Sequence, residues 1–479
     1  MIQRPLNPPK SQPGAPTPLR HAKAARFAGA LATVATAVAL MGQYGGGPPI
    51  WWQAGSGERV PFTASFEDTN GTSLIYSANG DIVSKGHPFF EPLGANRRAC
   101  ITCHQLSAGM SVSTERLQQR WVDTAGDDPV FAAVDGSDCP TLPQSERDSH
   151  SLLLNHGLFR IYQPWPAAGV TPEFTIEVLR DPTGCNTGKQ YGLHAAKPTI
   201  SVYRRPRVVG NFKYMADSAG AFTADSRATT LEAQALDAVL KHEEGSARSL
   251  SADDLKELVD FEKQIYVAQV TDATGGDLAE VGGPKGLGTW HLGLGKDIHD
   301  NNGFFTIDKW TGGQGERAAF RASVERGSKV FSNHTFAIKD AAYAPAGKAT
   351  CSTCHSERMT GINTTQAWMD IGTAEPQWAG DRKELPLFRI TCSNTAQPHP
   401  QFGRVILTND PGRALVTGKC RDVGSLVMQQ LRGLSARAPY FTAGSANTLR
   451  DVVDFYDKRF QAHYTEQEKQ DLTNFLRVL

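Results

Sequence analysis

The chain has 479 residues and a formal net charge of zero, with 49 lysines and arginines against 49 aspartates and glutamates. A protein that binds nucleic acid normally carries a basic surplus, so this balance argues against a nucleic-acid partner. Hydrophobic residues make up 40% of the chain and charged residues 20%, a composition that supports a folded core and excludes a largely disordered chain.

The first 45 residues have the layout of an export signal. Basic, Pro-rich residues up to Arg26 precede an uncharged apolar run from Phe27 to Met41. This order is typical of secretory signals, and the run is shorter than the roughly 20 residues of a membrane span. We therefore expect residues 1–45 to be a signal peptide or an uncleaved membrane anchor, residues 46–84 to be a linker or N-terminal segment, and the body of the protein to be periplasmic.

Four of the eight cysteines form two copies of one motif. Residues 100–104 (CITCH) and 351–355 (CSTCH) both read C-x-x-C-H, the attachment motif for haem c. Two thiols three residues apart reach the two vinyl groups of one haem, and the adjacent histidine then ligates the iron. A redox pair or half of a zinc site would leave both histidines unexplained. The sequence thus predicts two covalent haems, attached at Cys100, Cys103, Cys351 and Cys354, with His104 and His355 as proximal ligands.

The other four cysteines follow the haem motifs in pairs. In an oxidising compartment the simplest interpretation is one disulfide Cys139–Cys185 and a second disulfide Cys392–Cys420. Pairing between the two halves of the chain stays open as an alternative.

The stretch that closes each half of the chain is repeated. Residues 251–261 (SADDLKELVDF) and 465–475 (TEQEKQDLTNF) each begin with Ser or Thr followed three residues later by an acid, which is the capping box that starts a helix. Each then places Leu and Phe three residues apart, on one helical face. With a haem motif upstream of each, we expect a duplicated lobe at residues 85–270 and 315–479, joined by a Gly-rich connection at 271–314.

The first lobe contains an insertion at about residues 120–210, rich in Pro, Gly, Val and Tyr. Residues 175–179 (TIEVL) and 199–203 (TISVY) alternate enough to predict short strands. The predicted fold is therefore mainly α, with two cytochrome c-like haem lobes and a loop-rich, partly β insertion in the first.

Further motifs make the chain similar to a known family. Residues 431–441 (LRGLSARAPYF) and 448–456 (TLRDVVDFY), together with the two CxxCH lobes, resemble the bacterial di-haem cytochrome c peroxidase/MauG family. Residues 203–206 (YRRP), 231–234 (LEAQ) and 408–413 (TNDPGR) add to the match. The resemblance covers nearly all of the chain from residue 85 onward and is weakest in the insertion.

In that family the N-terminal haem is the peroxide site, and a glutamine followed ten residues later by a glutamate lines its open side. The resemblance implies that Gln234 and Glu244 are these residues, with Glu243 and His242 as the neighbours that a small offset would select. A carboxylate suits this chemistry because it can accept a proton from peroxide and return it to the leaving oxygen. The alternative to a catalytic role is that Glu243 and Glu244 form the solvated end of a helix before Gly245.

The C-terminal haem of the family is six-coordinate and stores or relays an electron. Its second iron ligand is a methionine in the peroxidases and a tyrosine in MauG-type enzymes. The segment after the A-P-Y-F motif holds no methionine, so the resemblance implies Tyr456. Met428 and Met369 stay open as alternatives, as does an ordinary buried role for Tyr456. A phenolate favours high oxidation states of iron, whereas a methionine favours Fe(II).

Two more family features bear on this chain. Members bind a calcium ion between the lobes, and the matching positions are Asn211, Arg437 and Pro439; oxygen ligands suit a hard cation, although Asn211 could equally be a turn residue. Members also carry a tryptophan ten residues before the glutamine, as an electron relay between the haems. Here that position is Ala224, with Phe222 nearby, which is a departure from the family pattern.

The resemblance implies an exported oxidoreductase that reduces hydrogen peroxide at the His104 haem, while the His355 haem shares or relays the oxidising equivalents. The electron donor would be a small cytochrome c or cupredoxin, or, in a MauG-like role, a protein residue or an organic substrate. The alternative is an electron-transfer di-haem cytochrome c without peroxidase chemistry, and a third hypothesis is a redox or ligand sensor. An electron carrier would need a sixth ligand for the first haem, for which the N-terminal lobe offers His87, His150, His156 and His242.

Overall fold

The computed structural model describes residues 48–214, 222–278, 287–289, 310, 312–338, 347–355 and 368–479. The expected signal or anchor at residues 1–45 and most of the connection at 271–314 lie outside these ranges. Among the helices in the described ranges, none is long and apolar enough to cross a membrane.

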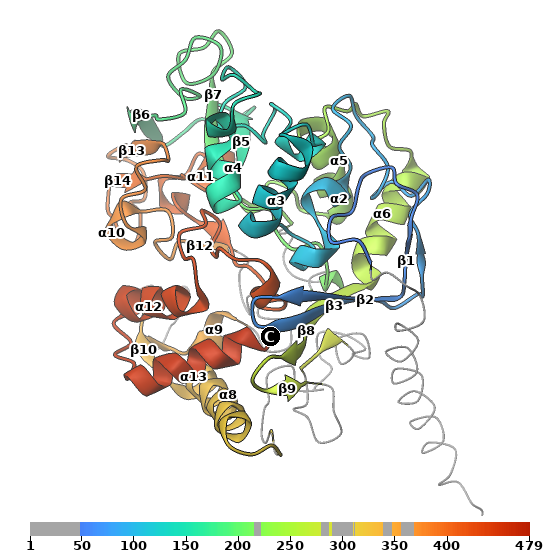
Figure 1. Cartoon of the computed structure of the whole chain (residues 1–479). Helices are drawn as coiled ribbons and strands as arrows, with labels where there is room; N and C mark the ends of the chain where they lie inside the picture. Colours follow the sequence, from blue (N-terminus) through green and yellow to red (C-terminus); the bar gives the residue numbers. More distant parts are fainter. Residues whose placement is uncertain are drawn as a thin grey trace, which may run out of the picture. The chain divides into compact units, whose positions relative to one another are not determined.

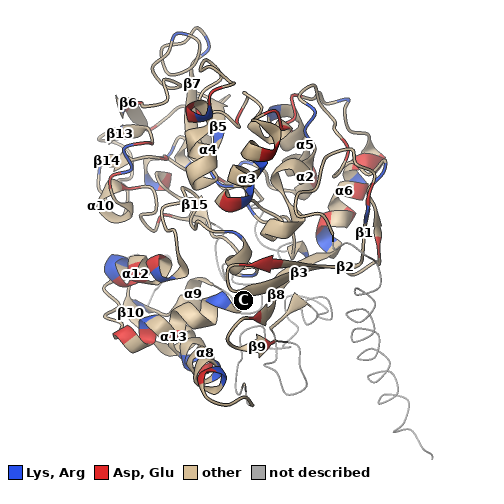
Figure 2. Ribbon diagram, viewed as in Figure 1, with Lys and Arg blue, Asp and Glu red and all other residues tan. Residues whose placement is uncertain are grey.

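Helices carry both CxxCH motifs and close both halves of the chain (Figure 1). The α-helices are α2 (Cys100–Cys103), α3 (Thr114–Thr124), α4 (Ser151–His156), α5 (Leu231–Lys241), α6 (Ala252–Gln264), α8 (Glu316–Asn333), α9 (Cys351–Cys354), α10 (Pro376–Ala379), α11 (Ala414–Thr417), α12 (Leu449–Phe460) and α13 (Glu466–Arg477). Single 3-10 turns occur at η1 (Leu106–Ala108), η2 (Pro129–Phe131), η3 (Arg147–His150), η4 (Phe212–Tyr214), η5 (Cys420–Asp422) and η6 (Leu434–Ala436). Acidic and basic residues alternate along the outer helices α3, α6 and α12, in keeping with the zero net charge (Figure 2).

Strands are more numerous than the sequence predicts. A four-stranded sheet has the order β2 (Thr63–Asp68), β3 (Gly71–Ser77), β8 (Ile265–Asp272) and β9 (Gly276–Asp277), and a three-stranded sheet has the order β14 (Val405–Thr408), β13 (Leu387–Cys392) and β6 (Phe174–Arg180). Two-stranded pairs are formed by β1 (Arg59–Val60) with β4 (Ile82–Val83), β5 (Phe159–Pro164) with β7 (Thr199–Arg204), β10 (Phe336–Ala337) with β11 (Lys348–Ala349), and β12 (Trp368–Met369) with β15 (Leu426–Val427). The expectation of a mainly helical fold is therefore met only in part.

Within the segment expected to be a linker or N-terminal segment, residues 59–83 form four strands of the folded body. Its strands β2 and β3 pair antiparallel, and β3 pairs in turn with β8, with Leu74 opposite Ala268 and Ile75 opposite Val267. Every second residue from Ser73 onward in β3 is buried, which is the pattern of a strand with one face on the core. Strand β8 begins directly after α6, so this sheet fixes the end of the first half of the chain.

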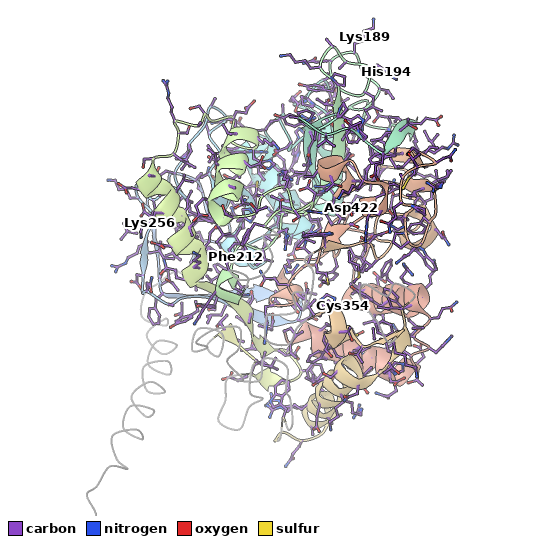
Figure 3. The ribbon with its side chains drawn as sticks, turned by 180° about the vertical axis from the view of Figure 1, so that it is seen from behind. Lys189, His194, Phe212, Lys256, Cys354 and Asp422 are labelled. Atoms are coloured by element: carbon purple, nitrogen blue, oxygen red, sulfur yellow. A yellow bond between two sulfur atoms is a disulfide. The ribbon has the colours of Figure 1, made fainter. Side chains whose placement is uncertain are left out.

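The insertion is also tied to the second half of the chain. The two strands predicted in it are present as β6 and β7. Strand β6 pairs with β13, where Ile390 lies opposite Ile176 on one side and Ile406 on the other. Figure 3 shows Lys189 and His194 at the outer tip of the loop between β6 and β7. Both expected disulfides, Cys139–Cys185 and Cys392–Cys420, are present, and each lies within one half.

The repeated helices are confirmed as α6 and α13, each capped by the expected box. Ser251 Oγ accepts from the Asp254 N–H at 3.1 Å, and Thr465 Oγ1 accepts from the Glu468 N–H at 3.2 Å. The repeat extends to an aromatic chain that reaches each haem-motif histidine. Ring centroids are 4.4 Å apart for Phe261–Phe89 and 6.5 Å for Phe89–His104, and in the second half 5.4 Å for Phe475–Phe331 and 6.3 Å for Phe331–His355.

Candidate active site

Each CxxCH motif forms a single helical turn that its own sequence caps. The third residue of the motif is threonine in both copies, and its hydroxyl accepts from the backbone N–H just before the first cysteine: Thr102 from Ala99 at 3.1 Å and Thr353 from Thr350 at 2.9 Å. The turn brings both thiols of a motif to one side, and the four thiols stay outside disulfides.

The first motif opens onto a cavity of about 1160 Å³, mouth included, which Cys100, Cys103 and His104 all line. His104 Nδ1 lies 3.2 Å from the Met110 carbonyl oxygen, to which its N–H donates. A hydrogen bond from one ring nitrogen to a backbone carbonyl is the kind that orients a metal-binding histidine, whose other nitrogen ligates the metal. Burial lowers the pKa of His104 to about 4, so the ring is neutral and able to bind a metal at neutral pH. Phe212, labelled in Figure 3, lines the same cavity.

Helix α5 supplies the opposite wall of this cavity. Gln234, Ala238 and His242 are four residues apart on one helical face and all line the cavity, as does Ala235. The two alanines leave room for a flat ligand, whereas Gln234 and His242 bring polar groups to it. The structure therefore brings the predicted Gln234 and His242 together with His104.

The predicted glutamate is displaced by one residue. Helix α5 ends at Lys241, and Glu244 adopts a left-handed conformation with φ of 54°, is exposed and does not line the cavity. Glu243 is buried and does line it; its Oε2 accepts from the Leu93 N–H at 3.2 Å, and its Oε1 lies 3.7 Å from Cys100 Sγ. Burial raises the pKa of Glu243 to about 7. The ten-residue spacing from Gln234 thus points one residue too far, because the chain turns outward after the helix.

Sequence reasoning missed two cavity residues, Asp135 and Arg98. Asp135 comes from the insertion, and its Oδ2 lies 2.5 Å from His242 Nδ1. Its Oδ1 accepts from the buried Arg98 guanidinium. Neither residue belongs to a recognisable motif, and no periodic pattern surrounds Asp135, so only the fold reveals the pairing.

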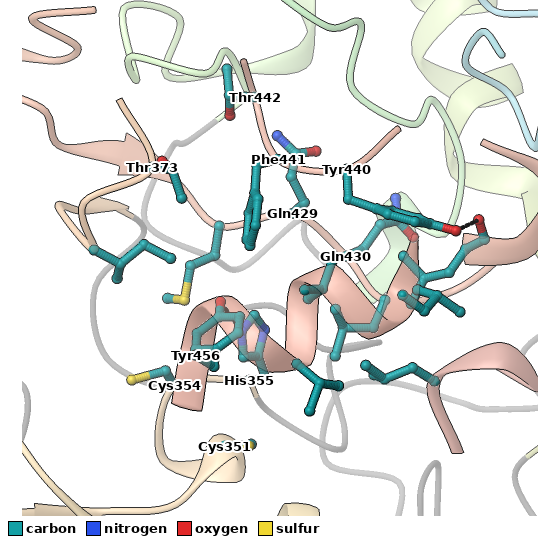
Figure 4. Close-up of a pocket in the computed structure, with 18 of the residues that line it drawn as sticks. Cys351, Cys354, His355, Thr373, Gln429, Gln430, Tyr440, Phe441, Thr442 and Tyr456 are labelled. Carbon is teal, nitrogen blue, oxygen red and sulfur yellow. Dashed lines mark hydrogen bonds between the residues drawn. The ribbon is translucent and has the colours of Figure 1, made fainter. Parts of the chain in front are cut away.

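The second motif opens onto a cavity of about 1480 Å³, mouth included, which Figure 4 shows in close-up. The Tyr456 hydroxyl, from α12, lies 3.5 Å from His355 Nε2. Met369 and Met428 line the same cavity, so all three candidate second ligands of this site are gathered around it. Burial raises the pKa of Tyr456, which keeps the free phenol neutral.

A thin wall separates the two cavities. Arg205 and Pro206 line both of them. Ala224, at the position of the expected tryptophan, accepts through its carbonyl from the Val427 N–H at 2.8 Å. The Arg207 guanidinium donates to the carbonyl oxygens of Thr223 and Met428, at 3.2 Å each. At this point of the wall, backbone and guanidinium groups therefore make the contacts between the two cavities.

Of the four histidines considered as a sixth ligand, His242 is the one that lines the first cavity. His87 packs against Phe90 and Phe261. His150 has both ring nitrogens within 3 Å of carbonyl oxygens, and His156 lies beside Glu384 at 3.7 Å.

Comparison with known proteins gives two curated relatives. No protein-family model matches the chain. Cytochrome-c peroxidase IdrP1 of Denitromonas iodatirespirans is 28% identical over 186 residues, which are 36% of this chain and 44% of that protein. The protein of the same name from Pseudomonas sp. (strain SCT) is 28% identical over 182 residues, 34% of this chain and 42% of that protein. The resemblance to the di-haem cytochrome c peroxidase/MauG family is confirmed. The matched part is less than half the length of either relative.

Two solved structures are also similar to the chain. One is a MauG-like protein associated with microbial copper homeostasis, with a TM-score of 0.32 and 17% identity over 58% of this chain and 74% of that one. The other is hydrazine synthase of Kuenenia stuttgartiensis, with a TM-score of 0.31 and 14% identity over 77% of this chain and 93% of that one. Likenesses of this size carry no argument about the site.

The cavities fit the haem groups of the di-haem peroxidase family. Each cavity has two unbridged thiols and a histidine at one side and apolar or small residues around it. The first haem would be held by Cys100, Cys103 and His104, and the second by Cys351, Cys354 and His355.

The calcium ion of the di-haem peroxidase family does not fit this chain. Asn211 is buried, but its Oδ1 accepts from the Val267 N–H at 3.0 Å. The Arg437 carbonyl oxygen, a second expected ligand, accepts from the Arg205 guanidinium at 3.0 Å. The guanidiniums of Arg205 and Arg437 are both buried here, and a divalent cation beside them would be repelled. Pro439, the third expected position, lines the second haem cavity.

Proposed function

We propose that the chain is an exported di-haem c-type oxidoreductase of the peroxidase/MauG type, which reduces hydrogen peroxide at the His104 haem while the His355 haem shares or relays oxidising equivalents. The observation that carries this proposal is the difference between the two cavities. Two groups able to move protons, His242 and Glu243, line the first cavity, together with the hydrogen-bonding amide of Gln234. In the second, Tyr456 stands 3.5 Å from His355 Nε2 as a candidate second ligand.

When bound, haem supplies the electrons that break the O–O bond. The protein would position peroxide against Gln234 and supply the proton acceptor from the α5 end of the cavity. Reduction of one peroxide consumes two electrons and two protons and releases two waters. The electrons come from an external one-electron donor, either a small cytochrome c or cupredoxin or, in a MauG-like role, a protein or organic substrate. A bound ferric ion at His355 would favour the phenolate of Tyr456 over the phenol, and phenolate favours high oxidation states.

The test is donor oxidation by hydrogen peroxide in the presence of the purified di-haem protein. We expect two equivalents of reduced cytochrome c or cupredoxin to be oxidised per peroxide. Electron exchange with the donor but no peroxide-dependent turnover would contradict the proposal.

The alternative function, an electron-transfer di-haem cytochrome c, is supported by one observation. Electron transfer without catalysis needs a sixth ligand on the first haem, and His242 lines that cavity. Two low-spin ferric haems that ignore peroxide would favour this alternative.

A further inference from the structure

A histidine–carboxylate pair stands at the α5 end of the first cavity. His242 Nδ1 lies 2.5 Å from Asp135 Oδ2, and the Asp135 side chain is only 3% exposed. The two partners are 107 residues apart in the sequence, and Asp135 belongs to the insertion. Burying a carboxylate costs desolvation free energy, so a buried pair beside a cavity is a candidate for a function.

Arg98 holds Asp135 in its ionised form and fixes its place. The guanidinium pairs with Asp135 Oδ1 and also donates to the carbonyl oxygens of Pro129 and Val130, at 2.6 Å each. Burial alone would raise the pKa of Asp135, but Arg98 and His242 outweigh it and hold the pKa below its usual value. Because Arg98 is two residues before Cys100, the carboxylate is tied to the first haem motif itself.

An ionised carboxylate accepts a hydrogen bond and cannot donate one, so the proton of a neutral His242 lies on Nδ1. Nε2 is then the unprotonated nitrogen. Among the contacts of the described residues, His242 Nε2 has no hydrogen-bond partner, and the side chain lines the cavity together with His104. The charged or titratable groups that face this ring are Arg98, His104, Asp135 and Glu243.

The side chain of Glu243, the other candidate acid or base, is held by more contacts than the Nε2 side of His242. Its Oε2 accepts from the Leu93 N–H, and its Oε1 points at Cys100 Sγ, where the thioether of an attached haem would lie. Gly94 packs so closely that a Cβ there would lie 1.8 Å from the Glu243 carbonyl oxygen, so the backbone of Glu243 is pinned as well.

We propose that His242 is the catalytic base for hydrogen peroxide in the first cavity, and that Asp135 is the positioning residue that fixes its tautomer and orientation. This inference rests on the proposed function and names the residue that moves the proton. Nε2 of His242 takes the proton from one peroxide oxygen and returns it to the other. The O–O bond then breaks with its electron pair on the oxygen that received the proton, and this oxygen leaves as water. The remaining oxygen becomes the second water with two protons from solvent and two electrons from the external one-electron donor.

The experiment is stopped-flow reaction of the di-haem holoprotein with hydrogen peroxide, in the ferric and one-electron-reduced forms, across pH. His242→Gln and Asp135→Asn should each lower the second-order rate constant by on the order of 100-fold. Asp135→Glu, which keeps a carboxylate beside the ring, should recover part of the rate that Asp135→Asn loses, whereas a purely structural role would not separate the two variants in this way. His242→Gln keeps the buried Arg98–Asp135 pair, so it tests the proposal even where Asp135→Asn fails to fold.

The matched controls are exposed residues of the same types. Asp127→Asn, whose side chain is 89% exposed, and His194→Gln at the loop tip should react like the wild type. A wild-type rate in His242→Gln, or a loss confined to Glu243→Gln, would overturn the inference and leave the proposed function standing. A low-spin first haem that turns high-spin in His242→Gln would make His242 an iron ligand and overturn it too. A wild-type holoprotein inert to peroxide would overturn both.

Discussion

The Tyr456 hydroxyl faces His355 Nε2 at 3.5 Å across the second cavity, with the two rings inclined at 77°. Tyr456 is held there by α12 and by stacking on Phe460, with ring centroids 5.9 Å apart. Met369 and Met428 also line the cavity. The short distance between Tyr456 and His355 supports our proposal that Tyr456 is the second ligand of the C-terminal haem.

Tyr456→Phe should raise the reduction potential of that haem. A phenolate stabilises the ferric state, and axial ligands set haem potentials over a range of about 0.8 V. A spectroelectrochemical titration of the holoprotein measures the shift, and Met369→Leu and Met428→Leu are the matched comparisons. An unchanged potential in Tyr456→Phe with a large shift in either methionine variant would assign the ligand to that methionine.

Burial of Glu262 should make stability depend on pH. Glu262 is 4% exposed on α6, and burial raises its pKa from 4.5 to about 8. A carboxyl whose pKa is higher in the folded state contributes stability that is fully present below its unfolded pKa and is lost as pH rises through the folded value. Urea unfolding should therefore show the wild type losing stability relative to Glu262→Gln between about pH 5 and pH 8.

Glu243 should cause a similar loss of stability as pH rises, because burial also raises its pKa, to about 7. This loss remains in the Glu262→Gln variant. Glu257→Gln, on the same helix with a side chain 52% exposed, is the control and should follow the wild type. Equal pH slopes for the wild type and Glu262→Gln would show that Glu262 is not protonated in the folded protein.

The contact between α8 and α13 depends on Gly327. A Cβ on this residue would lie 2.0 Å from the Asp471 carbonyl oxygen and 2.8 Å from Phe475 Cβ. Gly327→Ala should lower the free energy of unfolding by roughly 1–3 kcal/mol through overpacking, despite the better helix propensity of alanine. Chemical denaturation measures it, with Ala322→Ser on the exposed side of α8 as the control. A Gly327→Ala protein as stable as the wild type would mean that the helices can separate without cost.

Calcium should have no effect on stability. The Arg205 guanidinium donates to the carbonyl oxygens of His156, Val112 and Arg437, at 2.9, 2.6 and 3.0 Å, so a fixed cation already binds these oxygens. Burial and the neighbouring Arg437 lower the pKa of Arg205 to about 9, which leaves it charged at neutral pH. We expect the midpoint of thermal unfolding to be the same with a calcium chelator and with excess calcium chloride.

Removing this guanidinium should be costly. Arg205→Met leaves several buried carbonyl oxygens without a hydrogen-bond donor, and each one costs about 1–3 kcal/mol of stability. The midpoint of thermal unfolding should therefore fall by several degrees. Arg59→Met, with a side chain 70% exposed, is the matched control. A ligand that binds the folded state stabilises it. A rise in the unfolding midpoint of the wild type with calcium would therefore contradict the conclusion that the family's calcium ion does not fit this chain.

Local signals in the sequence were enough for the parts of this molecule that depend on short spacings. The CxxCH turns, both capping boxes and the strands β6 and β7 follow from neighbouring residues, and the two disulfides agree with the simplest pairing of the cysteines in chain order. The sheet of β2, β3 and β8 did not, because Thr63–Asp68 pairs through β3 with a strand about 200 residues later, and nothing local specifies that partner.

The residues of the candidate site also divide into those that the sequence predicted and those that only the fold reveals. Gln234 lies on α5 and His242 caps the end of that helix, so the helix itself places both beside the cavity. Glu244 was misplaced because the helix ends before it and a left-handed residue turns its side chain outward. Asp135, Arg98 and Arg205 were missed because each acts through a partner that only the tertiary fold brings close.

Electron paramagnetic resonance of the ferric holoprotein at low temperature, before and after one equivalent of hydrogen peroxide, distinguishes a di-haem peroxidase from an electron carrier. We expect one high-spin haem at His104 and one low-spin haem at His355, with both signals lost on adding peroxide. Two low-spin haems that peroxide leaves unchanged, and that stay unchanged after one-electron reduction, would contradict a peroxidase and leave an electron carrier.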